Sequence, residues 1–270
     1  MLNFENKPGY DFDDLRKLIE LLRGPGGCPW DREQTHESIR RNLIEEAYEA
    51  AESIDNGDTE NLIEELGDVL MQVIFHAHIA EIAGQFDLND ITDATCRKLI
   101  RRHPHVFGDI SAENGAQSLA FWDSIKREEK KQDAVTDAMR SVARSLPALW
   151  RAEKIQQKAA KPGFDWPDHT GALEALDQEL GELKDAISVG DGVGEELGDL
   201  IFSAVNVARF FDVDPEEALG KSCDKFISRF AHVENESLKQ GRDLTDMTLD
   251  EMEEIYLQAK ADGSRQYDSD

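Results

Sequence analysis

Glu64-Glu-Leu-Gly-Asp-Val-Leu70 is the stretch that decides the fold, because it recurs as Glu195-Glu-Leu-Gly-Asp-Leu-Ile201 in the second half of this 270-residue chain. An acidic pair precedes each copy, and a basic pair follows it. Around the first copy these are Glu46 with Glu49 and Lys98 with Arg102; around the second they are Glu179 with Glu182 and Lys225 with Arg229. The order acidic helix, acidic helix, basic helix occurs twice, which predicts a tandem duplication of one helical module.

Apolar residues recur at helical spacing along most of the chain, and no alternating run predicts a strand of useful length. The predicted fold class is therefore all-α, with N-caps expected at Thr35, Asp58, Asp90 and Asp214. Helices are expected at Asp11–Leu22, Thr35–Ile54, Thr59–Ala83, Ile91–Arg102, Ser118–Lys131, Ala148–Ala160, Thr170–Ser188 and Glu195–Phe211, then from Pro215, and from Thr248 to about Lys260. The two modules are expected at residues 1–132 and 147–270, joined by a linker at residues 133–146 with few large apolar side chains.

The net charge of the chain argues against some classes of binding partner. Acidic residues outnumber basic ones 57 to 30, so the net charge is −27. Such a chain lacks the basic footprint of a nucleic-acid-binding protein and would not adhere to an anionic membrane. We expect no membrane span, because no apolar run approaches 18 residues, and no signal peptide at the N-terminus. The three cysteines are far apart and form no disulfide framework, which indicates a cytoplasmic protein.

The acidic pairs lie beside the apolar stripes of their helices. At about 100° per residue, Glu46 and Glu49 border one stripe, and Glu65 and Asp68 border another. The stripes contain Ile39, Leu43, Ala47, Ala50 and Ile54 on the first helix, and Leu62, Leu66, Val69 and Val73 on the second. If the helices pack antiparallel, four carboxylates converge at a partly buried seam, where unpaired anions would repel one another and lose hydration.

Divalent cations would relieve both costs, and a site made only of oxygen ligands suits Mg²⁺ or Mn²⁺. Solvated charges on two amphipathic helices would explain one such set of acids. The duplicate set at the same helical-wheel position favours a metal site. Redox iron is disfavoured, because a di-iron bundle would carry Glu-x-x-His where this chain has Glu-x-x-Asp.

The basic pairs and one amide are further candidates. Lys98 with Arg102 and Lys225 with Arg229 have i, i+4 spacing, so each pair projects from one helix face. They could contact phosphate oxygens or form salt bridges to neighbouring helices. Asn206 follows Asp199 by about two turns of the same helix. It could hydrogen-bond a substrate or lie at the edge of the core.

These residues together resemble a known family. The pattern Glu45-Glu46-x-x-Glu49 followed by Glu65-x-x-Asp68 is similar to the signature of the all-α MazG nucleoside triphosphate pyrophosphohydrolases. Four further segments resemble the two-module members of that family: Gly27-Cys-Pro-Trp-Asp31, Arg101-Arg-His-Pro-His-Val-Phe107, Ser145-Leu-Pro-Ala-Leu149 and Gly163-Phe-Asp-Trp166. The resemblance implies Mg²⁺-dependent hydrolysis of a nucleoside triphosphate or deoxynucleoside triphosphate to the monophosphate and pyrophosphate. It also implies a homodimer whose helices complete four-helix-bundle sites.

The resemblance also assigns roles to residues. In the second module it implies that metal is held by Glu179, Glu182, Glu196 and Asp199, the catalytic set. Lys225 and Arg229 would contact the triphosphate or its nucleoside, and Tyr256 stands where an aromatic that stacks on a base is expected. In the first module the metal role falls to Glu46, Glu49, Glu65 and Asp68.

Two features of the sequence bear on which module catalyses, and they favour different modules. The doubled glutamate Glu45-Glu46 of the first module is Gln178-Glu179 in the second, which would impair the second module if the first acid of the pair is the base. Only the second module combines Asn206 with Tyr256, and we therefore favour it as the catalytic one. The alternative from another functional class is a non-catalytic helical interaction scaffold that retains the acidic sites for structural metal.

Overall fold

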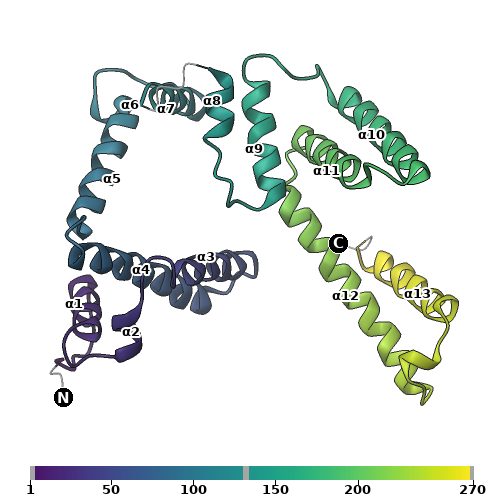
Figure 1. Cartoon of the computed structure of the whole chain (residues 1–270), viewed down its shortest axis with the longest axis horizontal. Helices are drawn as coiled ribbons and strands as arrows, with labels where there is room; N and C mark the ends of the chain where they lie inside the picture. The colour runs from purple at the N-terminus through teal and green to yellow at the C-terminus, as the bar shows by residue number, and fades with distance from the viewer. Residues whose placement is uncertain (1–3, 130–133, 268–270) are drawn as a thin grey trace. The chain divides into compact units, whose positions relative to one another are not determined.

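The computed structural model describes residues 4–129 and 134–267, and over this part of the chain helices joined by turns and loops are the only regular secondary structure, without β-strands (Figure 1). Described in chain order, the helices are α1 (Phe12–Arg23), α2 (Pro29–Glu33), α3 (Arg40–Asp55), α4 (Thr59–Ile82), α5 (Leu88–Arg102), α6 (Pro104–Phe107), α7 (Gly115–Glu129), α8 (Val135–Arg140), α9 (Ala148–Ala160), α10 (His169–Val189), α11 (Val193–Phe210), α12 (Pro215–Lys239), a 3₁₀ turn (Leu244–Asp246) and α13 (Leu249–Tyr267). The all-α prediction is confirmed. Among the described residues, no helix is long and apolar enough to cross a membrane.

The chain divides into two compact units, unit 1 (Met1–Lys126) and unit 2 (Arg127–Asp270). The stretch predicted as a linker contains α8, which packs against α9, and the buried side chain of Val142. Asp133, where that linker begins, lies outside the described residues, as does Lys131. The module limits at residues 132 and 147 stay a prediction.

Unit 1 is built around a small apolar core and one long helical hairpin. Ile19 of α1, Ile39, and Ile74 with Phe75 of α4 form the buried cluster. The turn between α3 and α4 contains Gly57 at φ +65°, a conformation that glycine adopts without steric cost. The two helices pack against each other over this turn, so residues of α3 and α4 face one another.

Unit 2 contains the equivalent hairpin, formed by α10 and α11. Gly190 and Gly192 both have positive φ in the turn between them, at +81° and +75°. Asp214 caps α12 by accepting hydrogen bonds from two backbone N–H groups, and it also accepts one from the Trp150 indole of α9 at 2.9 Å. Helices α12 and α13 form a second hairpin beyond this cap.

The predicted starts of α3, α5 and α7 and the predicted end of the last helix are wrong. Helix α7 begins at Gly115 and not at Ser118. Thr35 does not cap α3, because its backbone N–H donates to the Ser38 hydroxyl at 2.9 Å and the two residues form a separate turn. Helix α5 begins earlier than expected, at Leu88, because Asp87 is the N-cap and Asp90 closes the capping box. The last helix continues to Tyr267.

Part of each predicted apolar stripe is not buried within its own unit. Ile54 is 62% exposed and Leu66 is 52% exposed, although Ile39 and Ala50 of the same hairpin are buried. The reason is geometric, since a two-helix hairpin can cover only one side of each helix.

Candidate active site

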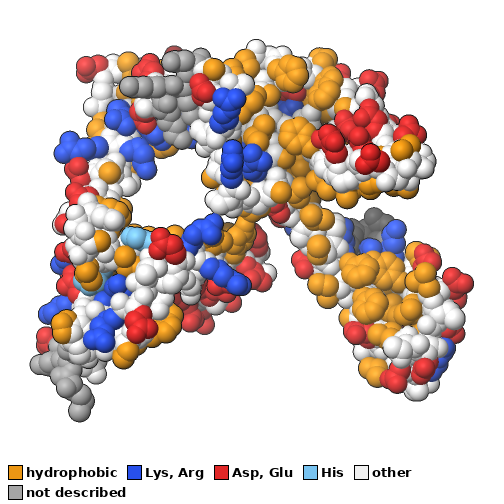
Figure 2. Space-filling view, viewed as in Figure 1, with side chains coloured by type: hydrophobic (Ala, Val, Ile, Leu, Met, Phe, Trp, Pro, Cys, Tyr) orange, Lys and Arg blue, Asp and Glu red, His pale blue; other side chains and the backbone are white. Residues whose placement is uncertain are grey.

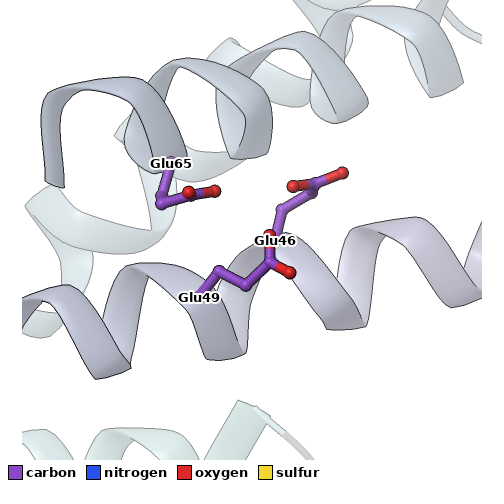
Figure 3. A group of neighbouring side chains, drawn as sticks. All are labelled: Glu46, Glu49 and Glu65. Atoms are coloured by element: carbon purple, nitrogen blue, oxygen red, sulfur yellow. The ribbon is translucent and has the colours of Figure 1, made fainter. Parts of the chain in front are cut away.

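The first acidic cluster lies in the seam between α3 and α4. Carboxylate oxygens of Glu46, Glu49 and Glu65 lie within 4.8 Å of one another. Figure 3 shows the first two side chains rising from one helix and the third descending from the other. Glu46 and Glu65 are half-buried, whereas Glu49 is exposed. The hairpin thus brings together acids that lie almost twenty positions apart in the sequence.

The second cluster repeats this arrangement on α10 and α11. Oxygens of Glu179, Glu196 and Asp199 also lie within 4.8 Å of one another. Acidic side chains gather over this hairpin in Figure 2. The two groups differ in which helix contributes two of the three acids. In unit 1 this is α3, the first helix of the hairpin, and in unit 2 it is α11, the second helix. Asp68 and Glu182 complete the two predicted sets of four but lie outside the closest groups.

The carboxylates perturb one another electrostatically. Desolvation raises the pKa of Glu46, and three nearby carboxylates raise it further: those of Asp68, Glu49 and Glu65. In unit 2, desolvation raises the pKa of Glu196, followed by the negative charges of Glu182, Asp199, Glu195 and Glu179. The pKa values of Glu65 and Glu179 are raised by the same two causes. The charges of Asp68 and Glu182 therefore raise pKa values within the clusters, although both residues lie outside the closest groups.

A cation suits these clusters on chemical grounds. The donors are all carboxylate oxygens, which are the ligands that Mg²⁺ and Mn²⁺ prefer. The raised pKa values of Glu46 and Glu196 show that a negative charge at these two positions is unfavourable, and a divalent ion would reverse that penalty. The residues therefore fit a hard divalent metal in each unit.

The position that distinguishes the two motifs has a different partner in each unit. Glu45 forms an ion pair with Arg41, one turn earlier on α3, at 2.6 Å. Its counterpart Gln178 donates a hydrogen bond to the Glu182 carboxylate at 2.8 Å. In neither unit does this residue belong to the closest group of acids, so the change from Glu to Gln leaves that group intact.

The predicted basic and aromatic residues lie on other helices. Arg229 of α12 stands over the Tyr256 ring of α13, with its guanidinium carbon 5.9 Å from the ring centroid, and Phe226 lies 5.7 Å from the same ring. Lys225 is exposed. Within the described part of unit 2, no ion pair joins Lys225 or Arg229 to the acidic cluster. In unit 1, Lys98 is exposed, but Arg102 is buried over the Trp122 ring.

Asn206 belongs to a network that the sequence did not predict. Its side-chain oxygen accepts hydrogen bonds from Arg209 Nε at 3.0 Å and Nη2 at 2.8 Å. Arg209 also bonds both carboxylate oxygens of Asp165, at 2.8 and 2.5 Å. The one available signal was the spacing of Asn206 and Arg209 on a helix, because Asp165 lies 44 positions away.

A second unpredicted contact lies in unit 1. His36 and His76 face each other with their Nδ1 atoms 2.7 Å apart and their rings stacked. Burial lowers the pKa of His76, and the charge of His36 lowers it further.

Comparison with known proteins places these features in a family. The model of the MazG nucleotide pyrophosphohydrolase domain matches the chain twice, over residues 34–107 and 168–234. These two segments contain the two acidic hairpins. The chain is 44% identical over 252 residues to a nucleoside triphosphate pyrophosphohydrolase/pyrophosphatase MazG of Thermotoga maritima, covering 93% of this chain and 96% of the relative.

Two further relatives agree. A nucleoside triphosphate pyrophosphohydrolase of Escherichia coli K12 is 44% identical over 92% of this chain and 96% of its own length. One of Mycolicibacterium smegmatis is 42% identical over 59% of this chain and 49% of its own length. The chain therefore belongs to the MazG family of nucleotide pyrophosphohydrolases, enzymes that hydrolyse a phosphoric anhydride.

Proposed function

We propose that the protein hydrolyses nucleoside triphosphates, or their deoxy forms, to the monophosphate and pyrophosphate with Mg²⁺ as its cofactor and Mn²⁺ as a substitute. The observation that carries this proposal is the duplicated group of converging carboxylates on adjacent helices. A triphosphate approaching a chain of net charge −27 needs a cation between the two sets of negative charges. The acidic clusters are where that cation would bind.

In this proposal the second module holds the metal through Glu179, Glu182, Glu196 and Asp199. Mg²⁺ would supply charge neutralisation for the triphosphate and make water more acidic. One carboxylate of the set orients a water molecule and accepts its proton as the oxygen attacks an inner phosphorus in line. The phosphoric anhydride bond breaks, and pyrophosphate and the nucleoside monophosphate leave. Lys225 and Arg229 contact the triphosphate, and Tyr256 stacks on the base.

We favour the second module because α11 carries a polar residue at a position where α4, the equivalent helix of the first module, carries an apolar one. Aligning Glu65 with Glu196 places Phe75 of α4 opposite Asn206 of α11. Phe75 is buried in the core beneath the Arg23 guanidinium, 4.7 Å from its ring centroid. It has no hydrogen-bonding group for a nucleotide. The first cluster, with Glu46, Glu49, Glu65 and Asp68, holds metal in a second site of the same kind.

The partners we propose are nucleoside triphosphates and a second copy of the chain. Nucleic acid and membranes are not expected partners, given the acidic surface. All three cysteines are free thiols, which suits the reducing cytoplasm, and there we expect the enzyme to act on the nucleotide pool.

Pyrophosphate release from ATP and dATP, with products identified, tests this function. The full-length protein should release pyrophosphate with Mg²⁺ and lose activity with excess EDTA. Changing Glu196→Gln with Asp199→Asn should lower kcat at least about 100-fold, because the carboxylates that hold the cation and water are removed. Changing Glu65→Gln with Asp68→Asn should have a much smaller effect.

Glu174→Gln is the matched control, since it removes a carboxylate from α10 about 140° around the helix from Glu179. It should leave turnover unchanged. Full activity in the Glu196/Asp199 variant together with loss in the Glu65/Asp68 variant would transfer catalysis to the first module. Metal binding without any turnover would contradict the proposed activity and support the alternative, a non-catalytic helical scaffold.

A further inference from the structure

The network of Asp165, Arg209 and Asn206 joins a loop to the helix that carries the second acidic cluster. Asp165 lies between α9 and α10, whereas the other two residues are on α11. Arg209 uses its Nε and both terminal nitrogens in four hydrogen bonds, and its guanidinium carbon stands 4.7 Å from the Phe210 ring centroid. The side chains of Arg209 and Asp165 are only 14% and 24% exposed. The arginine is therefore held rigidly.

The chemistry of arginine fixes the orientation of the Asn206 amide. A guanidinium group only donates hydrogen bonds, so the amide atom that faces it must be the oxygen. The amide nitrogen, with two N–H donors, must then lie on the other side of the group. Within the described part of the chain this nitrogen donates to no other residue. Asn206 is thus presented as a donor and not as an acceptor.

The position of Asn206 indicates which part of the substrate it meets. It follows Asp199 by seven residues, which places it within about 20° of the same helix face and about 10 Å further along the axis. If the acidic cluster holds the phosphates, a side chain displaced by this distance lies toward the nucleoside. The equivalent positions of unit 1 are Phe75, which is buried, and His78, so among the described residues the network is found in unit 2 and not in unit 1.

We propose that Asp165 and Arg209 are positioning residues that orient the Asn206 amide, so that its nitrogen donates a hydrogen bond to an acceptor atom on the nucleoside part of the substrate. The inference rests on the proposed function of the second module. It adds that α11 binds both ends of the nucleotide, and that the loop before α10 sets the polarity of the contact. The acceptor is a sugar or base oxygen or an unprotonated base nitrogen.

Steady-state kinetics with ATP and saturating Mg²⁺ test the proposal on the full-length protein. Asn206→Ala should raise KM roughly 5- to 10-fold, the effect of one lost hydrogen bond, with kcat within about twofold of wild type because the bond is made in both the ground and the transition state. Arg209→Met should give a similar KM. The double variant should be no worse than either single variant, because all three lose the same contact.

Asn206→Asp separates the positioning role from a purely structural one. Its carboxylate keeps an acceptor toward Arg209 and should preserve the thermal midpoint, yet it removes the outward N–H donor and should raise KM as much as Asn206→Ala. Arg209→Lys should be intermediate, since one ammonium cannot reproduce the fork of bonds. Lys239→Gln, which removes an exposed ion pair elsewhere in unit 2, should leave KM unchanged.

Several results would overturn the proposal. These are an unchanged KM in Asn206→Ala, multiplied effects in the double variant, a wild-type KM in Asn206→Asp, or losses confined to kcat. An inactive wild-type protein would overturn the proposed function itself. An active wild type with any of the four results above would overturn only the positioning role.

Discussion

Two kinds of perturbed carboxylate occur in this protein, and they have opposite effects on its stability. In the acidic clusters, neighbouring anions and desolvation raise the pKa of residues such as Glu196, so the metal-free protein carries unfavourable charge at neutral pH. At the start of α13, Glu251 accepts two hydrogen bonds from Arg242, and these lower its pKa to about 2. Carboxylates with a raised pKa indicate a binding site, whereas the Glu251 carboxylate stabilises the packing of α13 against the segment that follows α12.

The Glu251 pair predicts a defined pH dependence. Its folded pKa lies below its ordinary value of 4.5, so its contribution to stability is complete above pH 4.5 and is lost as the pH falls toward about 2. Arg242→Gln should therefore lower the thermal midpoint at pH 7, and the difference from wild type should shrink progressively below pH 4.5. Circular dichroism melts between pH 7 and pH 3 measure this. A constant difference over that range contradicts the prediction, and Arg97→Gln, which removes an exposed pair with Asp93, is the control.

At the scale of elements, each acidic site depends on a helical hairpin and the segments that brace it. The turns at Gly57 and at Gly190 with Gly192 fold the two acidic helices against each other. In unit 2 the loop before α10 is fixed by Trp166, which packs directly on Gly171. A Cβ atom at that glycine would lie 2.1 Å from Trp166 Cδ1. The same loop carries Asp165, so this packing supports the network that reaches Asn206.

Gly171→Ala should destabilise the protein by about 1–3 kcal/mol, because the indole must move to admit the methyl group. Gly181→Ala is the matched control on the same helix. No atom lies within 4 Å of the Cβ position there, so this change should stabilise the helix by about 0.5–1 kcal/mol. Urea unfolding followed by circular dichroism gives both values. A stabilising Gly171→Ala would show that Trp166 does not hold the loop.

At the scale of the whole molecule, both acidic hairpins leave matching apolar side chains uncovered. Leu66 and Leu70 of α4 correspond in the repeat to Leu197 and Ile201 of α11, which are 45% and 46% exposed. Apolar side chains also gather over the α12–α13 hairpin in Figure 2. Phe226 and Ile227 of α12 are exposed. Duplicated apolar faces beside duplicated acid clusters are expected of helices that complete a bundle with a second copy.

We therefore predict a homodimer in solution, with twice the 30.4 kDa mass of one chain. Leu197→Lys with Ile201→Lys should shift the protein toward the monomer, since two charges would be buried in the expected interface. Light scattering coupled to size exclusion at micromolar concentration measures the mass. Tyr10→Ser removes an exposed apolar side chain outside the repeated hairpins and should leave the dimer intact. A monomeric wild type at that concentration contradicts the prediction.

The sequence by itself determined the all-α class, the duplication and the acids that converge. Helical periodicity and an i, i+3 pair such as Glu196 and Asp199 are local properties, so they can be read without knowing what packs against them. Capping at Asp58 and Asp214 is local too. Only the tertiary structure decided which acids approach most closely, and that Asn206 is oriented by Arg209 and Asp165. These contacts join residues far apart in the chain, and their geometry depends on the turns and packing that bring separate helices and loops together.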